Sequence, residues 1–227
     1  LCGGLRRVHA FGIIEESMMN DNCPDRSFGP FRSEAFVRRE KPEMNKENDK
    51  KEWNEKELWE KAAAFHGHRC GGLAIGYRAA LYAAELLNLD FSDDEDVVCI
   101  AENDACGVDA IQAVLGCSVG KGNLLFHMRG KQAFSFYNRR SGASVRLVLK
   151  PKPGEMTREE SFAYYQSCRA EELFMVMETV LALPEPARLF DSYVCDGCGE
   201  RTGANWIRLS GSQKLCLDCY EQYDRFH

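Results

Sequence analysis

The chain has 227 residues, 44% of them hydrophobic, and a formal net charge of −6. This length allows one medium-sized domain with a packed core and one smaller domain. No apolar segment reaches the ~18 residues that a membrane-spanning helix needs, so an integral helical membrane protein is not expected.

Residues 1–43 show neither the helical nor the strand period. A polar segment begins at Met44 and looks like the start of a helical region. We therefore expect residues 1–43 to be a disordered leader or the product of upstream translation. The alternative is an N-terminal extension that packs on the core. The segment lacks a sustained apolar stretch, so it makes a poor signal peptide.

Residues 44–183 are predicted to form an α+β core. Apolar periodicity predicts helices at residues 53–65, 73–87 and 108–115, with a buried strand between Asp96 and Glu102. Asn103 or Asp104 is the expected cap of the third helix, and Gly116 is its expected end. Alternating β-forming residues predict strands at residues 124–127, 132–137 and 144–149, with Ser141-Gly142 as a hairpin turn. The order of these elements favours an antiparallel sheet with packed helices.

The end of the core is predicted from a helix-start signal and a proline-rich segment. Thr157-Arg-Glu-Glu160 has the pattern of a capping box, and we expect its helix to run towards Val180. Leu183-Pro-Glu-Pro186 marks a linker, which we place at residues 184–190.

Three potential metal ligands, His66, His68 and Cys70, stand two residues apart in the segment FHGHRCGG. On an extended segment this spacing puts all three side chains on one face, and the flanking glycines allow such a backbone. Cys70 would lie just before the N-terminus of the next helix, where the dipole favours a thiolate. The segment predicts a metal or thiol site, although each residue alone is more often a packed or capping side chain.

A second thiol-containing segment, ENDACGVDAIQAVLGCSVGKGN, places Cys106 at the start of the predicted third helix and Cys117 after it. Either cysteine is a candidate further ligand or reactive thiolate. Lys121 is a candidate catalytic or anion-binding residue, and we add Asn123 and Lys131 as candidate cofactor-binding residues. The sequence around Lys121 resembles a phosphate loop only superficially, because no strand-to-helix context follows it.

The C-terminal residues 191–227 contain two C-x-x-C pairs, Cys195/Cys198 and Cys216/Cys219. Each pair suits a tight turn that directs two thiolates to one point, and the segment between the pairs has zinc-finger length. We expect a structural zinc ion in a small domain of zinc-ribbon or treble-clef type. With four of the eleven cysteines in this finger and the others scattered, the composition fits a reducing cytoplasm better than a disulfide-rich secreted protein.

Three segments in order, FHGHRCGGLAIGYRAA, ENDACGVDAIQAVLGCSVGKGNL and GKQAFSFYNRRSGASVRL, resemble the E-subunit family of formylmethanofuran dehydrogenase. The resemblance covers about residues 53–150, and the C-terminal finger is similar to the zinc appendage of many members. It implies an α+β core, a homodimer and a metal near the histidine–cysteine motif. It also suggests an association with molybdenum or tungsten enzymes of one-carbon metabolism and methanogenesis.

Positive charge is concentrated in residues 119–152, which contain no acidic residue. The eight cationic residues of this block are Lys121, Arg129, Lys131, Arg139, Arg140, Arg146, Lys150 and Lys152. Such a block can hold an anionic small molecule or an acidic partner. The interleaved aromatic residues raise the possibility of a nucleic-acid platform, and the alternative is a strand face paired with acidic helices. The finger is net acidic and is a poor reader of nucleic acid, so a nucleic-acid partner is not favoured.

Two function classes follow from these features. The first is a metal- or thiol-dependent enzyme or subunit of an oxidoreductase, with a second transition metal at His66, His68 and Cys70 and zinc in the finger. The second is a non-catalytic accessory protein that docks on a partner oxidoreductase through the finger. The number of metal ions per chain discriminates between them.

Overall fold

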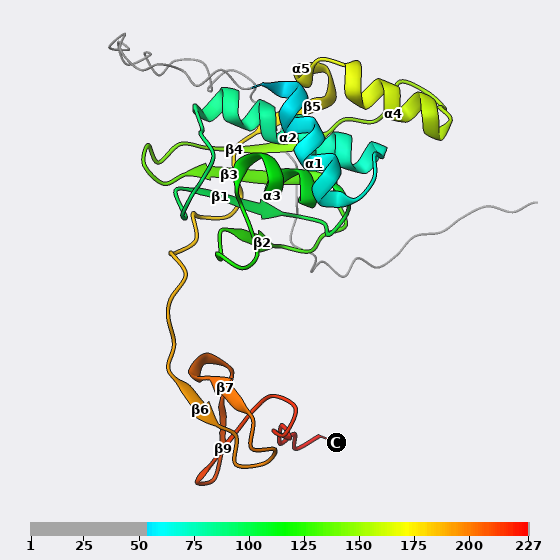
Figure 1. Ribbon diagram of the computed structural model, residues 1–227. Helices are drawn as coiled ribbons and strands as arrows, with labels where there is room; N and C mark the ends of the chain where they lie inside the picture. The colour runs from blue at the N-terminus through cyan, green and yellow to red at the C-terminus, as the bar shows by residue number, and fades with distance from the viewer. Residues whose placement is uncertain (1–53, 227) are drawn as a thin grey trace, which may run out of the picture. The chain divides into compact units, whose positions relative to one another are not determined.

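The computed structural model describes residues 54–226. The expectations for residues 1–43, and for the start of the core at Met44, lie outside the described residues. Figure 1 shows a layer of helices over a five-stranded sheet, and separate small hairpins that belong to the C-terminal segment. Among the described residues, no helix has both the length and the apolar character that a membrane crossing requires.

The first half of the core matches the predicted elements closely. Its elements are α1 (Glu55–His66), α2 (Gly71–Leu87), β1 (Val97–Ala101) and α3 (Gly107–Leu115). Gly116 ends α3 in the left-handed conformation, as its position predicted. The predicted cap of α3 is wrong: Cys106 occupies the N-cap, and the Asn103 side chain instead accepts from the Ala105 amide and donates to the Lys131 carbonyl.

The second half of the core adds the remaining strands and two short helices. These are β2 (Leu124–Phe126), β3 (Ala133–Asn138), β4 (Ser144–Leu149), α4 (Arg158–Ser167), α5 (Ala170–Leu173) and β5 (Phe174–Met177). The capping box of Thr157 and Glu160 is present at the start of α4. The expected continuation to Val180 is wrong. The backbone is extended at Cys168 and Arg169, and the β-forming segment FMVM pairs with the edge of β4 as β5.

The sheet has the strand order β2-β1-β3-β4-β5. The expected antiparallel pairing holds for β1–β3, β3–β4 and β4–β5, whereas β1 and β2 are parallel, so the sheet is mixed. The parallel pair arises because α3 forms the crossover between β1 and β2. The α+β class is therefore confirmed, with one parallel pair at the β2 edge.

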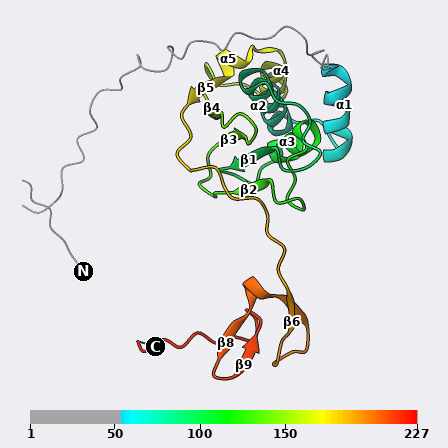
Figure 2. The same ribbon diagram turned by 90° about the vertical axis from the view of Figure 1, so that its left-hand side faces the viewer.

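Alternate residues of the strands face opposite sides of the sheet. Cys99 and Ala101 of β1 lie opposite Phe136 and Phe134 of β3, and all four side chains pack in the main core beneath the helices. Figure 2 shows α1, α2 and α3 gathered on this one side of the sheet. On the other side, Val98 packs in a smaller cluster with Ile100 and Tyr137. The strand β1 is buried on both faces, as the apolar sequence VVCIA predicted.

The C-terminal segment consists of two small hairpins. The first pairs β6 (Ser192–Val194) with β7 (Arg201–Gly203), and the second pairs β8 (Arg208–Ser210) with β9 (Gln213–Leu215). A single 3-10 turn, η1 (Ala204–Trp206), connects them. No helix occurs in residues 220–226, the described part of the chain after the last finger cysteine, so the hairpins fit a ribbon better than a treble clef.

Candidate metal centres in the core and the finger

The core histidines and Cys70 converge at the junction of α1 and α2. Helix α1 ends at His66 because Gly67 takes the left-handed conformation with φ 88°, and Cys70 is the N-cap of α2. One ligand atom from each of His66, His68 and Cys70 lies within 4.8 Å of the others. The predicted grouping is therefore observed. Its cause is a helix end followed directly by a helix start, and not a period-two extended segment.

Asp109 orients His66 within this cluster. The carboxylate oxygen Oδ2 of Asp109 lies 2.7 Å from Nδ1 of His66, and Nε2 of His66 lies 3.8 Å from the Cys70 sulfur. With Nδ1 donating to the carboxylate, Nε2 keeps its lone pair for a metal, which is the common arrangement around metal-binding histidines. The ring of His68 lies beside that of His66, with 4.4 Å between the ring centroids.

Asp109 is a site residue that the sequence motifs do not identify. It lies three residues after Cys106, in the first turn of α3. Its sequence signal was weak, because acidic residues are common in the first turn of any helix. Only the packing of α3 against α1 and α2 shows that this carboxylate serves His66.

Cys106, at the N-cap of α3, lies near Cys70 across Gly72. The pKa of its thiol is raised, first by burial and then by the neighbouring sulfur of Cys70. The two helices approach closely because glycines meet at their crossing: a Cβ on Gly76 would lie 1.9 Å from the carbonyl oxygen of Gly107. That Cys106 supplies a further donor beside Cys70 stays a prediction, because the group of ligand atoms within 4.8 Å of one another contains His66, His68 and Cys70 only.

Cys117 does not belong to this site. It follows the opposite end of α3, about 13 Å along the helix from Cys106. Its side chain is fully buried, its thiol donates to the carbonyl of Val97, and burial raises its pKa to about 12. A protonated, enclosed thiol is neither a ligand nor a nucleophile, so the prediction for Cys117 is wrong.

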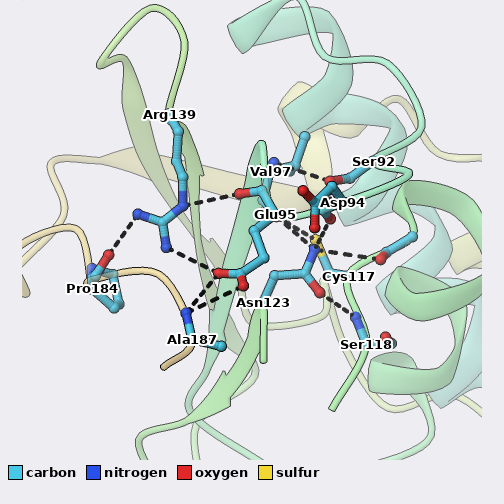
Figure 3. Close-up of polar contacts among 11 residues, drawn as sticks. Ser92, Asp94, Glu95, Val97, Cys117, Ser118, Asn123, Arg139, Pro184 and Ala187 are labelled. Carbon is cyan, nitrogen blue, oxygen red and sulfur yellow. Dashed lines mark hydrogen bonds and ion pairs between the residues drawn. The ribbon is translucent and has the colours of Figure 1, made fainter. Parts of the chain in front are cut away.

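Asn123 is a structural residue in the same region as Cys117 (Figure 3), and Lys121 belongs to the same loop after α3. Asn123 is fully buried and donates to carbonyls of Asp94, Val97 and Gly116, while it accepts from the amide of Ser118. Lys121 donates its ammonium to the carbonyl of Ser92 at 2.5 Å. These bonds tie the loop after α3 to the segment that leads into β1. The side chain of Asn123, a predicted cofactor-binding residue, is thus engaged within the fold, and the ammonium of Lys121, a predicted catalytic or anion-binding group, contacts a backbone carbonyl.

Lys131 is placed differently from Lys121. It is exposed, on the loop between β2 and β3, and its carbonyl accepts from the side chain of Asn103. The amides of Arg129 and Lys131 donate to the carbonyl of Glu102. This loop is therefore bonded directly to the segment Glu102–Ala105 that leads into Cys106, and Lys131 remains a candidate cofactor-binding residue.

Most of the basic block forms internal contacts. Arg146 and Glu102 make a largely buried ion pair, Arg139 contacts Glu95 and the carbonyl of Pro184, and Arg140 pairs with Asp96. The acidic partners stand beside β1 and not on acidic helices. Of the interleaved aromatic residues Phe126, Phe134, Phe136 and Tyr137, the last three are buried, so they are not available for stacking on bases.

The finger cysteines form the second candidate centre. The sulfur atoms of Cys195, Cys198, Cys216 and Cys219 all lie within 4.8 Å of one another. Each pair sits on a turn that directly follows a strand, β6 for the first pair and β9 for the second. Four thiolates at one point are the donor set of a closed, structural zinc site.

Backbone amides support the finger thiolates. The pKa of Cys195 is lowered to about 6, first by the amide of Cys198 and then by that of Cys216. The amides of Gly197 and Cys216 lie 3.4 and 3.2 Å from the Cys195 sulfur. This N–H bonding favours the charged sulfur that a metal requires, so the local fold and the donor set agree.

Comparison with known proteins identifies similar folds and sequences. A solved structure of a tungsten formylmethanofuran dehydrogenase FmdE-like protein from Syntrophus aciditrophicus superposes with a TM-score of 0.57 at 24% identity, covering 74% of this chain and 92% of that one. A probable S-adenosyl-L-methionine-binding protein of Archaeoglobus fulgidus is 27% identical over 203 residues, covering 72% of this chain. The alignment covers 52% of that relative, so the chain spans about half its length.

The family comparison covers the core centre and the whole sheet. The model of the family described as FmdE, molybdenum formylmethanofuran dehydrogenase operon, matches residues 65–183. This range is more than half of the chain, begins one residue before His66 and includes Cys70, Cys106 and Asp109. The chain is thus a member of the FmdE family that carries a four-cysteine cluster after the family domain.

Proposed function

We propose that the core of this FmdE-family protein binds a transition metal and serves a metal- or thiol-dependent step of one-carbon or redox metabolism, as an enzyme or as part of an oxidoreductase. His66, His68 and Cys70 would hold the metal, with Cys106 as a further donor. The convergence of the first three ligand atoms within 4.8 Å is the observation that carries the proposal.

The donor set fits a metal by its chemistry. Imidazole nitrogen and thiolate sulfur are the ligands that zinc and other late transition metals prefer. Asp109 bonds the far nitrogen of His66, as carboxylates commonly do behind metal-binding histidines. A metal held by His66, His68 and Cys70 alone would keep a fourth position for water or substrate and supply Lewis-acid activation there, whereas Cys106 as a fourth ligand would occupy that position.

The metal content of the full-length protein, purified without oxygen, tests this proposal. We expect two metal ions per chain in the wild type, because the finger and the core each bind one. Cys70→Ser should leave only the finger metal, and serine keeps the N-cap of α2. Cys198→Ser should leave only the core metal. Cys168→Ser is the matched control, since this thiol contacts Glu172 and not the cluster.

A wild-type protein with a single metal ion, lost in Cys198→Ser and kept in Cys70→Ser, would contradict the core centre. It would favour the second candidate function, a non-catalytic accessory protein that docks on a partner oxidoreductase through its finger. The finger offers apolar surface for such a contact, because Val194, Trp206 and Leu209 are each more than half exposed.

We further propose that Lys131 recognises an anionic group of the substrate. Its support is the bonding of its loop to the segment that leads into Cys106. Calorimetric titration with formate and with inorganic phosphate tests this proposal. Lys131→Ala should weaken binding, whereas Lys152→Ala, which removes a cation bonded to Ser161, should not. Equal binding by both variants would contradict the role of Lys131.

We also propose that the protein is a homodimer, as its resemblance to the family implies. Light scattering coupled to size-exclusion chromatography should give twice the chain mass of 25.7 kDa. A mass of one chain across the micromolar range would contradict a stable dimer.

A further inference from the structure

We propose that Cys70 and Cys106 are a redox-active dithiol, a modification site at which a hydroperoxide produces an intramolecular disulfide. The inference rests on the proposed function in one respect: the same two sulfurs are donors to the core metal, so oxidation and metal binding exclude each other. The dithiol itself stands on the geometry of the two thiols.

The fold brings the two thiols together from helix starts that are far apart in the sequence. Cys70 is the N-cap of α2 and Cys106 is the N-cap of α3. A Cβ placed on Gly72 would lie 3.6 Å from the Cys106 sulfur and 3.9 Å from the Cys70 sulfur. The neighbouring Cys70 sulfur also contributes to the raised pKa of the Cys106 thiol. Because the Gly76–Gly107 crossing allows no larger residue, this approach is built into the packing of the helices.

Access to solvent separates this pair from the other described cysteines of the core. Cys70 and Cys106 are both partly exposed, whereas Cys99 and Cys117 are buried. Cys168 is also partly exposed, but its thiol donates to the carboxylate of Glu172. Among the core cysteines that the structure describes, Cys70 and Cys106 therefore combine exposure with a neighbouring thiol, as redox-sensitive pairs do.

The formation of one disulfide consumes one molecule of hydroperoxide. The sulfur of one cysteine attacks the terminal peroxide oxygen, the O–O bond breaks, and a sulfenic acid and one molecule of water or alcohol form. The second sulfur then attacks the sulfenic sulfur, the S–O bond breaks, and water leaves. The two thiols together lose two electrons and two protons, which the peroxide takes up. A cellular thiol reverses the step by disulfide exchange.

The consequence for the core centre follows from the donor set. A Cys70–Cys106 disulfide removes both sulfur donors and leaves His66 and His68, which are too few ligands for the closed or three-ligand sites that zinc occupies. Oxidation would therefore release the metal, and a bound metal would protect the thiols. The fraction of core sites that hold a metal would therefore fall as the peroxide concentration rises.

Peptide mapping of the full-length protein tests the dithiol. Protein freed of metal by a chelator, and protein reloaded with zinc, are treated with hydrogen peroxide, trapped with N-ethylmaleimide and digested without reduction. We expect a peptide pair linked through Cys70 and Cys106 in the metal-free sample. In the zinc-loaded sample its formation should be at least about tenfold slower, because metal coordination withholds the sulfurs from the oxidant.

Variants distinguish the dithiol from accidental oxidation. Cys168→Ser should leave the linked peptide unchanged. In Cys106→Ser, Cys70 should proceed to sulfinic acid, because its resolving thiol is gone. Wild-type protein in which Cys70 reaches sulfinic acid while Cys106 stays reduced would overturn the proposal, and so would a disulfide from either residue to Cys168. Equal rates of disulfide formation with and without zinc would contradict the core metal site and leave the dithiol supported.

Discussion

Asp109 is the residue on which the orientation of His66 depends. Its carboxylate bonds Nδ1 and leaves Nε2 directed to the side where Cys70 lies. The interaction is side chain to side chain between two different helices, α1 and α3. Removing the charge should therefore affect metal affinity more than it affects the fold.

For Asp109→Asn we expect the core metal to bind about 10- to 100-fold more weakly, since hydrogen-bond partners of ligating histidines contribute on that scale. Competition with a chromophoric chelator measures the affinity, while the finger metal serves as an internal reference. Asp104→Asn, an exposed acid in the loop before α3, is the control. Equal loss of affinity in both variants would indicate a general charge effect and not a specific role of Asp109.

Glu102 and Arg146 are the second residue-scale feature, a bidentate pair at the end of β1 and in β4. Their side chains are only 10% and 9% exposed, and the hydrogen bonds from Arg146 lower the pKa of Glu102 below its ordinary value of 4.5. Because the folded pKa is lowered, the pair stabilises the fold above the ordinary pKa of a carboxyl group. This stabilisation is lost as the pH falls through the lower, folded pKa.

Glu102→Gln should consequently lower the free energy of unfolding by about 3 kcal/mol at pH 7, because the guanidinium loses its buried partner. The difference from wild type should shrink as the pH is lowered below 4.5 and the carboxylate becomes protonated. Urea unfolding across this pH range provides the measurement. Asp96→Asn removes the exposed pair with Arg140 and should change stability by less than about 1 kcal/mol. A difference for Glu102→Gln that is independent of pH would refute the electrostatic account.

At the scale of elements, the crossing of α2 and α3 positions the core centre. The carbonyl of Gly107 occupies the space that a side chain at Gly76 would need, and the two helices carry Cys70 and Cys106 at their starts. A backbone atom cannot move aside as a flexible side chain can, so the crossing tolerates only glycine at residue 76.

Gly76→Ala should destabilise the protein by about 3 kcal/mol, the upper part of the usual range for overpacking. It should also reduce core metal binding, because the helix starts would separate. Thermal unfolding and metal content follow the two effects. Gly71→Ala lies in the same helix, where a Cβ meets Tyr165 at an ordinary 3.4 Å, and should be tolerated. Wild-type stability in Gly76→Ala would show that the helices can shift without cost.

At the scale of the whole molecule, the family domain and the finger have separate means of stabilisation. The core buries two faces of β1 and a large apolar cluster, whereas the finger buries little besides Leu215 and the cysteine sulfurs. A segment with so small a core depends on its metal for folding.

Cys198→Ser is therefore expected to unfold residues 191–226 while the core keeps its unfolding temperature. Hydrogen exchange should show lost protection in β6 to β9 and unchanged protection in β1 and β3. Ser141→Ala, in the exposed turn between β3 and β4, is a suitable control for the exchange measurement. Destabilisation of the core strands by the finger substitution would show that the two parts fold together.

The sequence alone determined the local features of this protein. The finger cysteines, the glycine end of α3, the capping box of α4 and the buried strand β1 each follow from residues close together in the chain, whose spacing acts directly on the backbone. The segment FHGHRCGG also predicted the grouping of His66, His68 and Cys70, although a helix-to-helix junction and not an extended strand produces it.

Tertiary structure decided everything that depends on residues distant in the chain. The segment FMVM is a strand because it pairs with the edge of β4. The parallel pairing of β1 with β2 requires the crossover through α3. Cys106 and Cys117 are both candidate ligands in the sequence, yet packing places the first beside Cys70 and encloses the second. Burial and contacts between distant helices decide which thiols and carboxylates can act, and the local sequence does not specify either.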